Sequence, residues 1–256
     1  MRRGIAVLIS MITISFGMTV NGMEGDISEA EDIVAVQPVQ AEKEEEYVIV
    51  IDAGHQAVCD LSMEPIGPGA KEMKRKVSAG AVGCVTKLAE YELNLQVALK
   101  LQSVLEERGY TVVMVRTTHD VNISNSQRAQ IANEAKADAF IRIHANSFTD
   151  SSARGILTVC QTRKNPYNGT LYEKSRLLSD CVLSQMMEET GTKGKVWETD
   201  TMSGINWCET PVTIVEMGYM SNPKEDRLMA TEDYQNKLVI GMADGIDAYF
   251  AGLSAE

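Results

Sequence analysis

The stretch Tyr47-Val-Ile-Val-Ile-Asp-Ala-Gly-His55 decides the fold of this 256-residue sequence. A short run of β-branched and apolar residues is typical of a buried parallel strand, and Gly54 allows the chain to turn sharply where that strand ends. In open α/β sheets, ligands bind outside the carboxyl ends of the strands. The stretch therefore predicts a central strand that delivers His55 to a functional edge of a sheet.

Further apolar runs and amphipathic segments alternate along the rest of the chain. The expected strands are Tyr110 to Arg116, Ala139 to His144, Gly155 to Cys160 and Pro211 to Glu216, and the expected helices are Leu88 to Arg108, Ser124 to Ala137, Glu173 to Thr190 and Asp233 to Phe250. This alternation predicts a single α/β domain with a mostly parallel twisted sheet of about six strands, flanked by helices on both faces. Residues 56–88, rich in Gly, Pro and Lys, are expected to form a long substrate-facing loop with at most one short helix.

The first 46 residues differ in character from the rest. Arg2 and Arg3 precede an uncharged apolar run, which is typical of a secretory signal peptide, so residues 1–23 are interpreted as a signal peptide or, alternatively, as an uncleaved N-terminal membrane anchor. Residues 24–46 hold nine acidic residues and one lysine, which predicts an acidic disordered linker. Both interpretations predict an exported protein, in which residues 47–252 act outside the cytoplasm and contact a membrane only through an uncleaved first segment.

The net charge argues against one class of partner, and the cysteine spacing argues against one class of metal site. The formal net charge of −12 argues against a nucleic-acid partner, because binding to a phosphate backbone needs a basic face. The five cysteines include no CxxC pair, so the spacing of a zinc ribbon is absent. A disulfide between Cys59 and Cys84 and a set of free thiols are both consistent with the sequence.

Ionisable residues stand where three of the apolar runs end, namely His55, His144 and Glu216. Glu90 adds a fourth at the start of the first long predicted helix. Two histidines and a carboxylate form a common catalytic zinc shell, and a further carboxylate nearby can serve as general base and acid. The separations are too long for a local motif such as HExxH, so spacing alone leaves a structural role for each histidine open.

Six segments carry a resemblance to a known family. In chain order they are Val48-Ile-Val-Ile-Asp-Ala-Gly-His55, Glu90-Tyr-Glu-Leu-Asn-Leu95, Val113-Met-Val-Arg116, Arg128-Ala-Gln-Ile-Ala-Asn133, Ala137-Asp-Ala-Phe-Ile-Arg-Ile-His144-Ala-Asn146 and Pro211-Val-Thr-Ile-Val-Glu216-Met-Gly-Tyr-Met-Ser-Asn222. Together they resemble the zinc-dependent N-acetylmuramoyl-L-alanine amidases of bacterial cell walls, the amidase 3 catalytic domain, over about residues 47–250.

The resemblance implies a function and a site. It implies that His55, Glu90 and His144 bind Zn²⁺ and that Glu216 is the catalytic residue that activates the attacking water. The bond implied is the amide between N-acetylmuramic acid and L-alanine in peptidoglycan. Glu92 is the rival to Glu90 as a metal ligand, since both lie in one Glu-Tyr-Glu triplet. The alternative functions are a zinc peptidase or deacetylase on another wall polymer, and a non-catalytic peptidoglycan-binding module.

Three features depart from the family pattern. Gln56 stands where many members have a second glycine after the histidine, and the segment between His55 and Glu90 is long. Arg142 stands where a small residue is frequent, and a buried arginine requires a partner that the sequence does not identify. The basic residues among positions 71–76 are either a solvated charge run or a contact for stem-peptide carboxylates.

Overall fold

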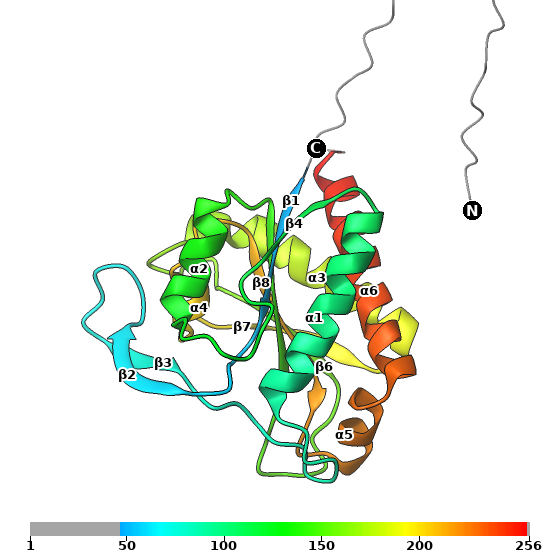
Figure 1. Ribbon diagram of the computed structural model, residues 1–256. Helices are drawn as coiled ribbons and strands as arrows, with labels where there is room; N and C mark the ends of the chain where they lie inside the picture. The colour runs from blue at the N-terminus through cyan, green and yellow to red at the C-terminus, as the bar shows by residue number, and fades with distance from the viewer. Residues whose placement is uncertain (1–46, 255–256) are drawn as a thin grey trace, which may run out of the picture. The chain divides into compact units, whose positions relative to one another are not determined.

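A six-stranded sheet forms the centre of the protein in a computed structural model that describes residues 47–254 (Figure 1). Its strands are β1 (Val48–Ala53), β4 (Thr111–Met114), β5 (Ala139–Asn146), β6 (Ile156–Cys160), β7 (Gly194–Glu198) and β8 (Val212–Tyr219), in the spatial order β4-β1-β5-β8-β6-β7. The first four strands of that order are parallel, whereas β6 is antiparallel to β8 and parallel to β7. The predicted α/β fold with a mostly parallel sheet is confirmed.

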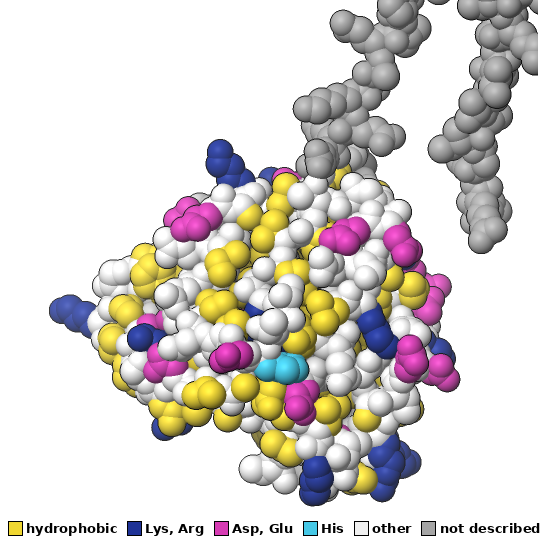
Figure 2. All heavy atoms as spheres, viewed as in Figure 1, with side chains coloured by type: hydrophobic (Ala, Val, Ile, Leu, Met, Phe, Trp, Pro, Cys, Tyr) yellow, Lys and Arg dark blue, Asp and Glu magenta, His cyan; other side chains and the backbone are white. Residues whose placement is uncertain are grey.

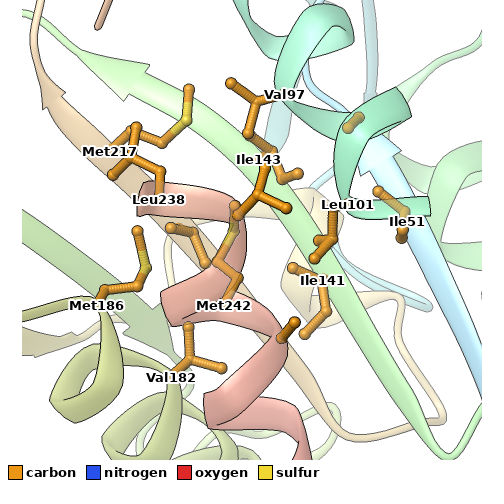
Figure 3. Packing of buried hydrophobic residues seen from close by; sticks show 14 of the residues in the cluster. Ile51, Val97, Leu101, Ile141, Ile143, Val182, Met186, Met217, Leu238 and Met242 are labelled. Atoms are coloured by element: carbon orange, nitrogen blue, oxygen red, sulfur yellow. The ribbon is translucent and has the colours of Figure 1, made fainter. Parts of the chain in front are cut away.

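Helices cover both faces of this sheet. Helices α1 (Glu90–Glu107), α3 (Tyr172–Thr190) and α6 (Glu232–Leu253) share the larger of two apolar clusters with one face, as the close view of packed side chains in Figure 3 shows. Helices α2 (Asn125–Glu134) and α4 (Ser203–Asn206) share the smaller cluster with the other face. The remaining helical segments are the 3-10 turn η1 (Gly169–Leu171) and α5 (Pro223–Met229).

Alternation along β1 divides its side chains between the two clusters. Ile49 and Ile51 belong to the larger cluster, and Val50 belongs to the smaller one. Because successive strand residues point to opposite faces, Asp52 faces the same side as Val50. Both faces of β1 are buried, which explains why the strand appears in the sequence as a continuous apolar run.

The segment 56–88 contains a β-hairpin, so the prediction of a loop with at most one helix is wrong. Strand β2 (Asp60–Pro65) pairs antiparallel with β3 (Met73–Val77) as a separate two-stranded sheet, which extends away from the main sheet in Figure 1. Most side chains of the hairpin are exposed or half-buried. A strand without a buried face lacks the apolar alternation by which strands are identified in sequences.

The remaining expectations concern the cysteines and the first 46 residues. The five cysteines are all free thiols, so the alternative of a bridge between Cys59 and Cys84 is not formed. The predictions of a signal peptide or anchor at 1–23 and of a linker at 24–46 lie outside the described residues. Between residues 47 and 254, none of the helices combines the length and the apolar character that crossing a membrane requires.

Helices α3 and α6 approach each other closely through two glycines. A Cβ built at Gly241 would lie 2.6 Å from the Cα of Met186, and one at Gly245 would lie 2.4 Å from the Cα of Val182. Real Cβ atoms do not approach backbone atoms at such distances, so both positions require glycine. This contact places α6 against the sheet and closes the larger apolar cluster.

Replacing Gly245 with alanine is expected to lower the free energy of unfolding by about 2 kcal/mol or more, because two helix backbones must move apart. Urea denaturation of residues 47–256 followed by circular dichroism measures the change. Gly252→Ala in the same helix is the matched control, since its Cβ would meet nothing closer than 3.7 Å. Equal effects of the two substitutions would contradict the close-packing interpretation.

Candidate active site

The four residues singled out in the sequence meet at the carboxyl ends of the parallel strands. His55 follows β1, Glu90 begins α1, and His144 and Glu216 are paired residues of the neighbouring strands β5 and β8. One ligand atom from each of His55, Glu90 and His144 lies within 4.8 Å of the other two. The Oε1 atom of Glu90 is 3.1 Å from Nε2 of His55 and 3.2 Å from Nδ1 of His144.

The backbone after β1 is shaped to bring the two histidines together. His55 has a φ of 61°, which lies in the left-handed region that residues other than glycine rarely adopt. A Cβ at the preceding Gly54 would lie 2.2 Å from Cε1 of His144. Glycine is therefore required there by the imidazole that packs against it, and the sharp turn aims His55 toward Glu90.

The end of the hairpin segment orients two of these side chains. The Nδ1–H of His55 donates to the carbonyl oxygen of Ser78 at 2.9 Å, which leaves Nε2 directed at Glu90. The Oε2 atom of Glu90 accepts a hydrogen bond from the backbone N–H of Ala81 at 2.7 Å. Partners of this kind fix ring orientation and tautomer in metal sites.

The electrostatics of the cluster are those of a charged carboxylate between imidazoles. Burial works to raise the pKa of Glu90, but its hydrogen bonds with His144 and His55 outweigh burial and hold that pKa well below its usual range. Burial works to lower the pKa of His55, yet the hydrogen bond to Glu90 raises it overall, whereas burial dominates at His144 and lowers its pKa. A carboxylate that stays ionised is ready to bind a cation.

This donor set fits a divalent metal ion. Two imidazoles and one carboxylate are ligands that first-row divalent ions accept. Within the described residues, the buried Nε2 atom of His144 and the buried Oε2 atom of Glu216 have no hydrogen-bond partner. Buried polar atoms are normally paired, so unpaired ones at this point are consistent with groups that meet an ion or a substrate.

Glu92, the rival ligand, lies outside the cluster. Its Oε2 atom accepts a hydrogen bond from the backbone N–H of Ala89 at 3.2 Å, where it caps the first turn of α1. The two acids of the triplet therefore have different contacts. Glu90 contacts the two histidines, whereas Glu92 contacts the backbone at the start of α1.

Glu216, His55 and His144 all line one cavity of about 400 Å³. The other residues that line this cavity are Lys74, Arg75, Ser78, Asn125, Arg142, Thr201, Met202, Ser203, Gly204 and Ile214. Burial raises the pKa of Glu216 to about 8, and the negative charge of Glu90 adds to the shift. A carboxyl group with such a pKa can both accept and donate a proton near neutral pH.

A buried ion-pair network that the sequence did not reveal lies beneath the histidines. The Oδ1 atom of Asp52 is 2.5 Å from Nη1 of Arg128, and its Oδ2 atom accepts from Nε of Arg142 at 2.9 Å. Asp52 is the partner of Arg142 that the sequence could not name. The adjacent positions of Asp52 and Arg142 in paired strands would have indicated it, once β1 and β5 were known to be neighbours.

Arg128 of this network, together with Arg116, also holds the turn that carries His55. Arg128 donates to the carbonyl oxygens of Ala53 and His55 at 3.1 Å each, and Arg116 donates from Nε to the Ala53 carbonyl at 2.7 Å. Gln56, the first departure from the family pattern, is fully buried and its Oε1 accepts from Nη2 of Arg128 at 2.9 Å. The turn is therefore fixed from below by charged side chains.

Known proteins resemble this chain in sequence. The sequence model of a family described as N-acetylmuramoyl-L-alanine amidase matches residues 49–248. The uncharacterised protein YqiI of Bacillus subtilis is 30% identical over 67% of this chain and 79% of its own length. The N-acetylmuramoyl-L-alanine amidase LytC of the same organism is 27% identical over 67% of this chain, although that match spans only 33% of LytC.

Solved structures agree with the fold. The catalytic domain of CwlV, an N-acetylmuramoyl-L-alanine amidase of Bacillus (Paenibacillus) polymyxa, is 31% identical with a TM-score of 0.63 over 80% of this chain and 98% of its own. The N-acetylmuramyl-L-alanine amidase Ami1 of Mycobacterium smegmatis, at 20% identity, has a TM-score of 0.73 over 80% of this chain and 97% of its own, and supports the fold alone.

Replacing Asp52 with asparagine is expected to lower the free energy of unfolding at pH 7 by about 3 kcal/mol or more, because it leaves two buried guanidinium groups without their carboxylate. Burial works to raise the pKa of Asp52, but Arg128 and Arg142 outweigh burial and hold it below its usual value. The stabilisation by Asp52 is therefore fully present above the unfolded-state pKa of about 3.9 and is lost as the pH falls below it.

Urea denaturation of the wild type and the Asp52→Asn variant between pH 3 and pH 8 tests this expectation. The difference between them should stay constant down to about pH 5 and shrink at more acidic pH. Asp120→Asn, at an exposed position, is the control and should change little. A difference that grew on acidification would contradict the assigned role of Asp52.

Proposed function

This chain belongs to the Amidase_3 family of N-acetylmuramoyl-L-alanine amidases, and we propose that it hydrolyses the amide bond between N-acetylmuramic acid and L-alanine in bacterial peptidoglycan. The observation that supports this proposal most directly is the convergence of His55, Glu90 and His144, whose ligand atoms lie within 4.8 Å of one another, next to the cavity that Glu216 lines together with both histidines. These are the four positions at which the resemblance places the functional residues of the family.

The proposed cofactor is Zn²⁺, held by His55, Glu90 and His144. Imidazole nitrogens and a carboxylate oxygen suit this ion, and a catalytic site of three protein ligands leaves a position for water or substrate. When bound, the ion would acidify a water molecule and polarise the amide carbonyl. The chain's own contribution is to hold the three ligand groups in place through Ser78, Ala81 and the turn after β1.

Glu216 is proposed to move the proton. Its carboxylate takes a proton from the attacking water and returns it to the leaving nitrogen, because an amide nitrogen is a poor leaving group until it is protonated. Burial raises the pKa of Glu216 because it disfavours the charged carboxylate, so the proton is readily retained between the two steps. A cation bound at the neighbouring ligands would favour the ionised form of Glu216 at the start of the reaction.

The place of action is proposed to be the cell wall or the outer face of the membrane. Residues 1–23 are proposed to export the chain, as a cleaved signal peptide or as a retained anchor, and residues 24–46 to link them to the catalytic domain at 47–252. A relative from Staphylococcus aureus, 24% identical over 64% of this chain, is named probable cell wall amidase LytH. The formal net charge of −12 argues against a nucleic-acid partner.

Digestion of purified peptidoglycan distinguishes the amidase from its alternatives. The zinc-loaded protein is expected to release free stem peptides with L-alanine at the amino terminus, which mass spectrometry identifies. Cuts within the stem peptide would indicate a peptidase, and loss of acetyl groups alone would indicate a deacetylase. Binding without any cleavage would favour the non-catalytic module.

Substitutions separate metal binding from proton transfer. His144→Ala is expected to lose bound zinc after dialysis, whereas Glu216→Gln should retain about one zinc per chain and lose roughly 100-fold or more in turnover. Atomic emission measures the metal, and release of stem peptides measures the rate. Glu92→Gln, two residues from a proposed ligand, is the matched control and should keep both properties. Turnover that survives in Glu216→Gln would refute the assigned role of this residue.

A further inference from the structure

The cavity beside the four site residues carries an excess of positive charge. Apart from His55, His144 and Glu216, its ionisable lining residues are Lys74, Arg75 and Arg142, and all three are cations. The protein as a whole has a formal charge of −12, so a cavity wall of this composition is opposite in sign to the molecule. A local excess of cations in a cleft concentrates anionic groups.

Arg142 is a fixed member of this wall. Its Nε donates to Asp52 at 2.9 Å and its Nη2 donates to Oδ1 of Asn125 at 2.9 Å. A Cβ at Gly204 would lie 1.6 Å from Nη1, so this glycine makes room for the guanidinium group. Because Asp52 also pairs with Arg128, one carboxylate serves two guanidinium groups and the buried network retains net positive charge.

The β2–β3 hairpin brings the other two cations to the wall. Its Glu64, paired in register with Lys74, is buried against α2 and α4, where its carboxylate accepts from Oγ of Ser126 at 2.6 Å and Oγ of Ser203 at 2.9 Å. The indole N–H of Trp207 donates to the carbonyl of Pro65 at 2.9 Å. The hairpin is therefore anchored to the domain.

The two hairpin cations are not neutralised by acids of the same region. Lys74 and Arg75 form no salt bridge with any residue between 47 and 254, whereas Lys76 lies 3.6 Å from a carboxylate oxygen of Asp60. Figure 2 shows Lys and Arg side chains along the edge of the molecule where the hairpin lies in Figure 1. The alternative of a solvated charge run suits Lys71, which is exposed and does not line the cavity.

The charged groups of the substrate determine which part of it the cationic cavity wall can bind. N-acetylmuramic acid has one carboxyl group, and that group is consumed in the amide bond to L-alanine. The glycan side of the bond is therefore uncharged, and the carboxylates lie on the peptide side. An ionised carboxylate forms strong hydrogen bonds with Lys and Arg, whereas the corresponding carboxamide does not.

We propose that Lys74, Arg75 and Arg142 form a subsite for a carboxylate of the stem peptide. The peptide then lies toward the β2–β3 hairpin, and the enzyme prefers stem peptides whose second residue carries a free carboxylate over those in which it is amidated. This inference rests on the proposed amidase function, since it identifies the substrate class of the same cavity.

The test compares two N-acetylmuramoyl tripeptides that differ only in a free carboxylate or a carboxamide on the second residue. The zinc-loaded full chain is expected to cleave the acid with a kcat/KM roughly tenfold higher, mainly through a lower KM. Lys74→Gln combined with Arg75→Gln should bring the ratio of the two substrates close to 1. Lys71→Gln, an exposed lysine of the same hairpin segment outside the cavity, should retain the wild-type ratio.

Binding of the two free tripeptides, measured by calorimetry with the wild type, separates this proposal from the amidase assignment. Preferential binding of the acid without hydrolysis of either muramoyl peptide would overturn the amidase function and support the carboxylate subsite. Hydrolysis of both at equal kcat/KM, with equal tripeptide affinities, would overturn the subsite and leave the amidase standing. An equal loss of preference in the Lys71→Gln variant would also overturn the subsite, because it would assign the effect to overall charge.

Discussion

The buried carboxylate of Asp52 is the constraint on which the site depends. It ties β1 to Arg142 on β5 and to Arg128 on α2, so three elements far apart in sequence are joined at one point. A buried ion pair of this kind is weak evidence for stability, since removing the charges from water is costly. Its effect is geometric: Arg128 continues to the carbonyls of Ala53 and His55 and so fixes the left-handed turn that presents His55.

The proposed metal ligands and the buried ion-pair network lie on connected parts of the same strands. Arg142 and His144 are two residues apart on β5 and therefore point to the same face, toward Glu216 on β8. A guanidinium group near Glu216 lowers the pKa of that carboxyl, while burial and Glu90 act more strongly in the other direction. The arrangement is compatible with both proposals, because the half-buried Glu216 has a raised pKa and the cations lie along the wall of the same cavity.

The central fold could be predicted, and three of the four proposed site residues could be singled out, because each is marked locally. Buried parallel strands are apolar runs, and His55, His144 and Glu216 interrupt the ends of such runs. The hairpin and β7 (Gly194–Glu198) could not be predicted in this way. Most of their side chains are exposed or half-buried, so their backbone pairing left no apolar periodic pattern. The partner of Arg142 could not be predicted for a different reason. Asp52 lies beside Arg142 only because β1 and β5 are neighbours, and the order of the strands is a property of the whole fold.

The hairpin segment connects the proposed carboxylate subsite with the proposed metal ligands. Lys74 on β3 lines the cavity, and four residues later Ser78 holds the ring of His55, while Ala81 holds the carboxylate of Glu90. Glu64 on β2 anchors the same segment to α2 and α4. Because one continuous stretch makes all three kinds of contact, a shift of the hairpin cannot alter substrate binding without also moving the partners of two proposed zinc ligands. The long insertion that departs from the family pattern is thus an integral part of the site.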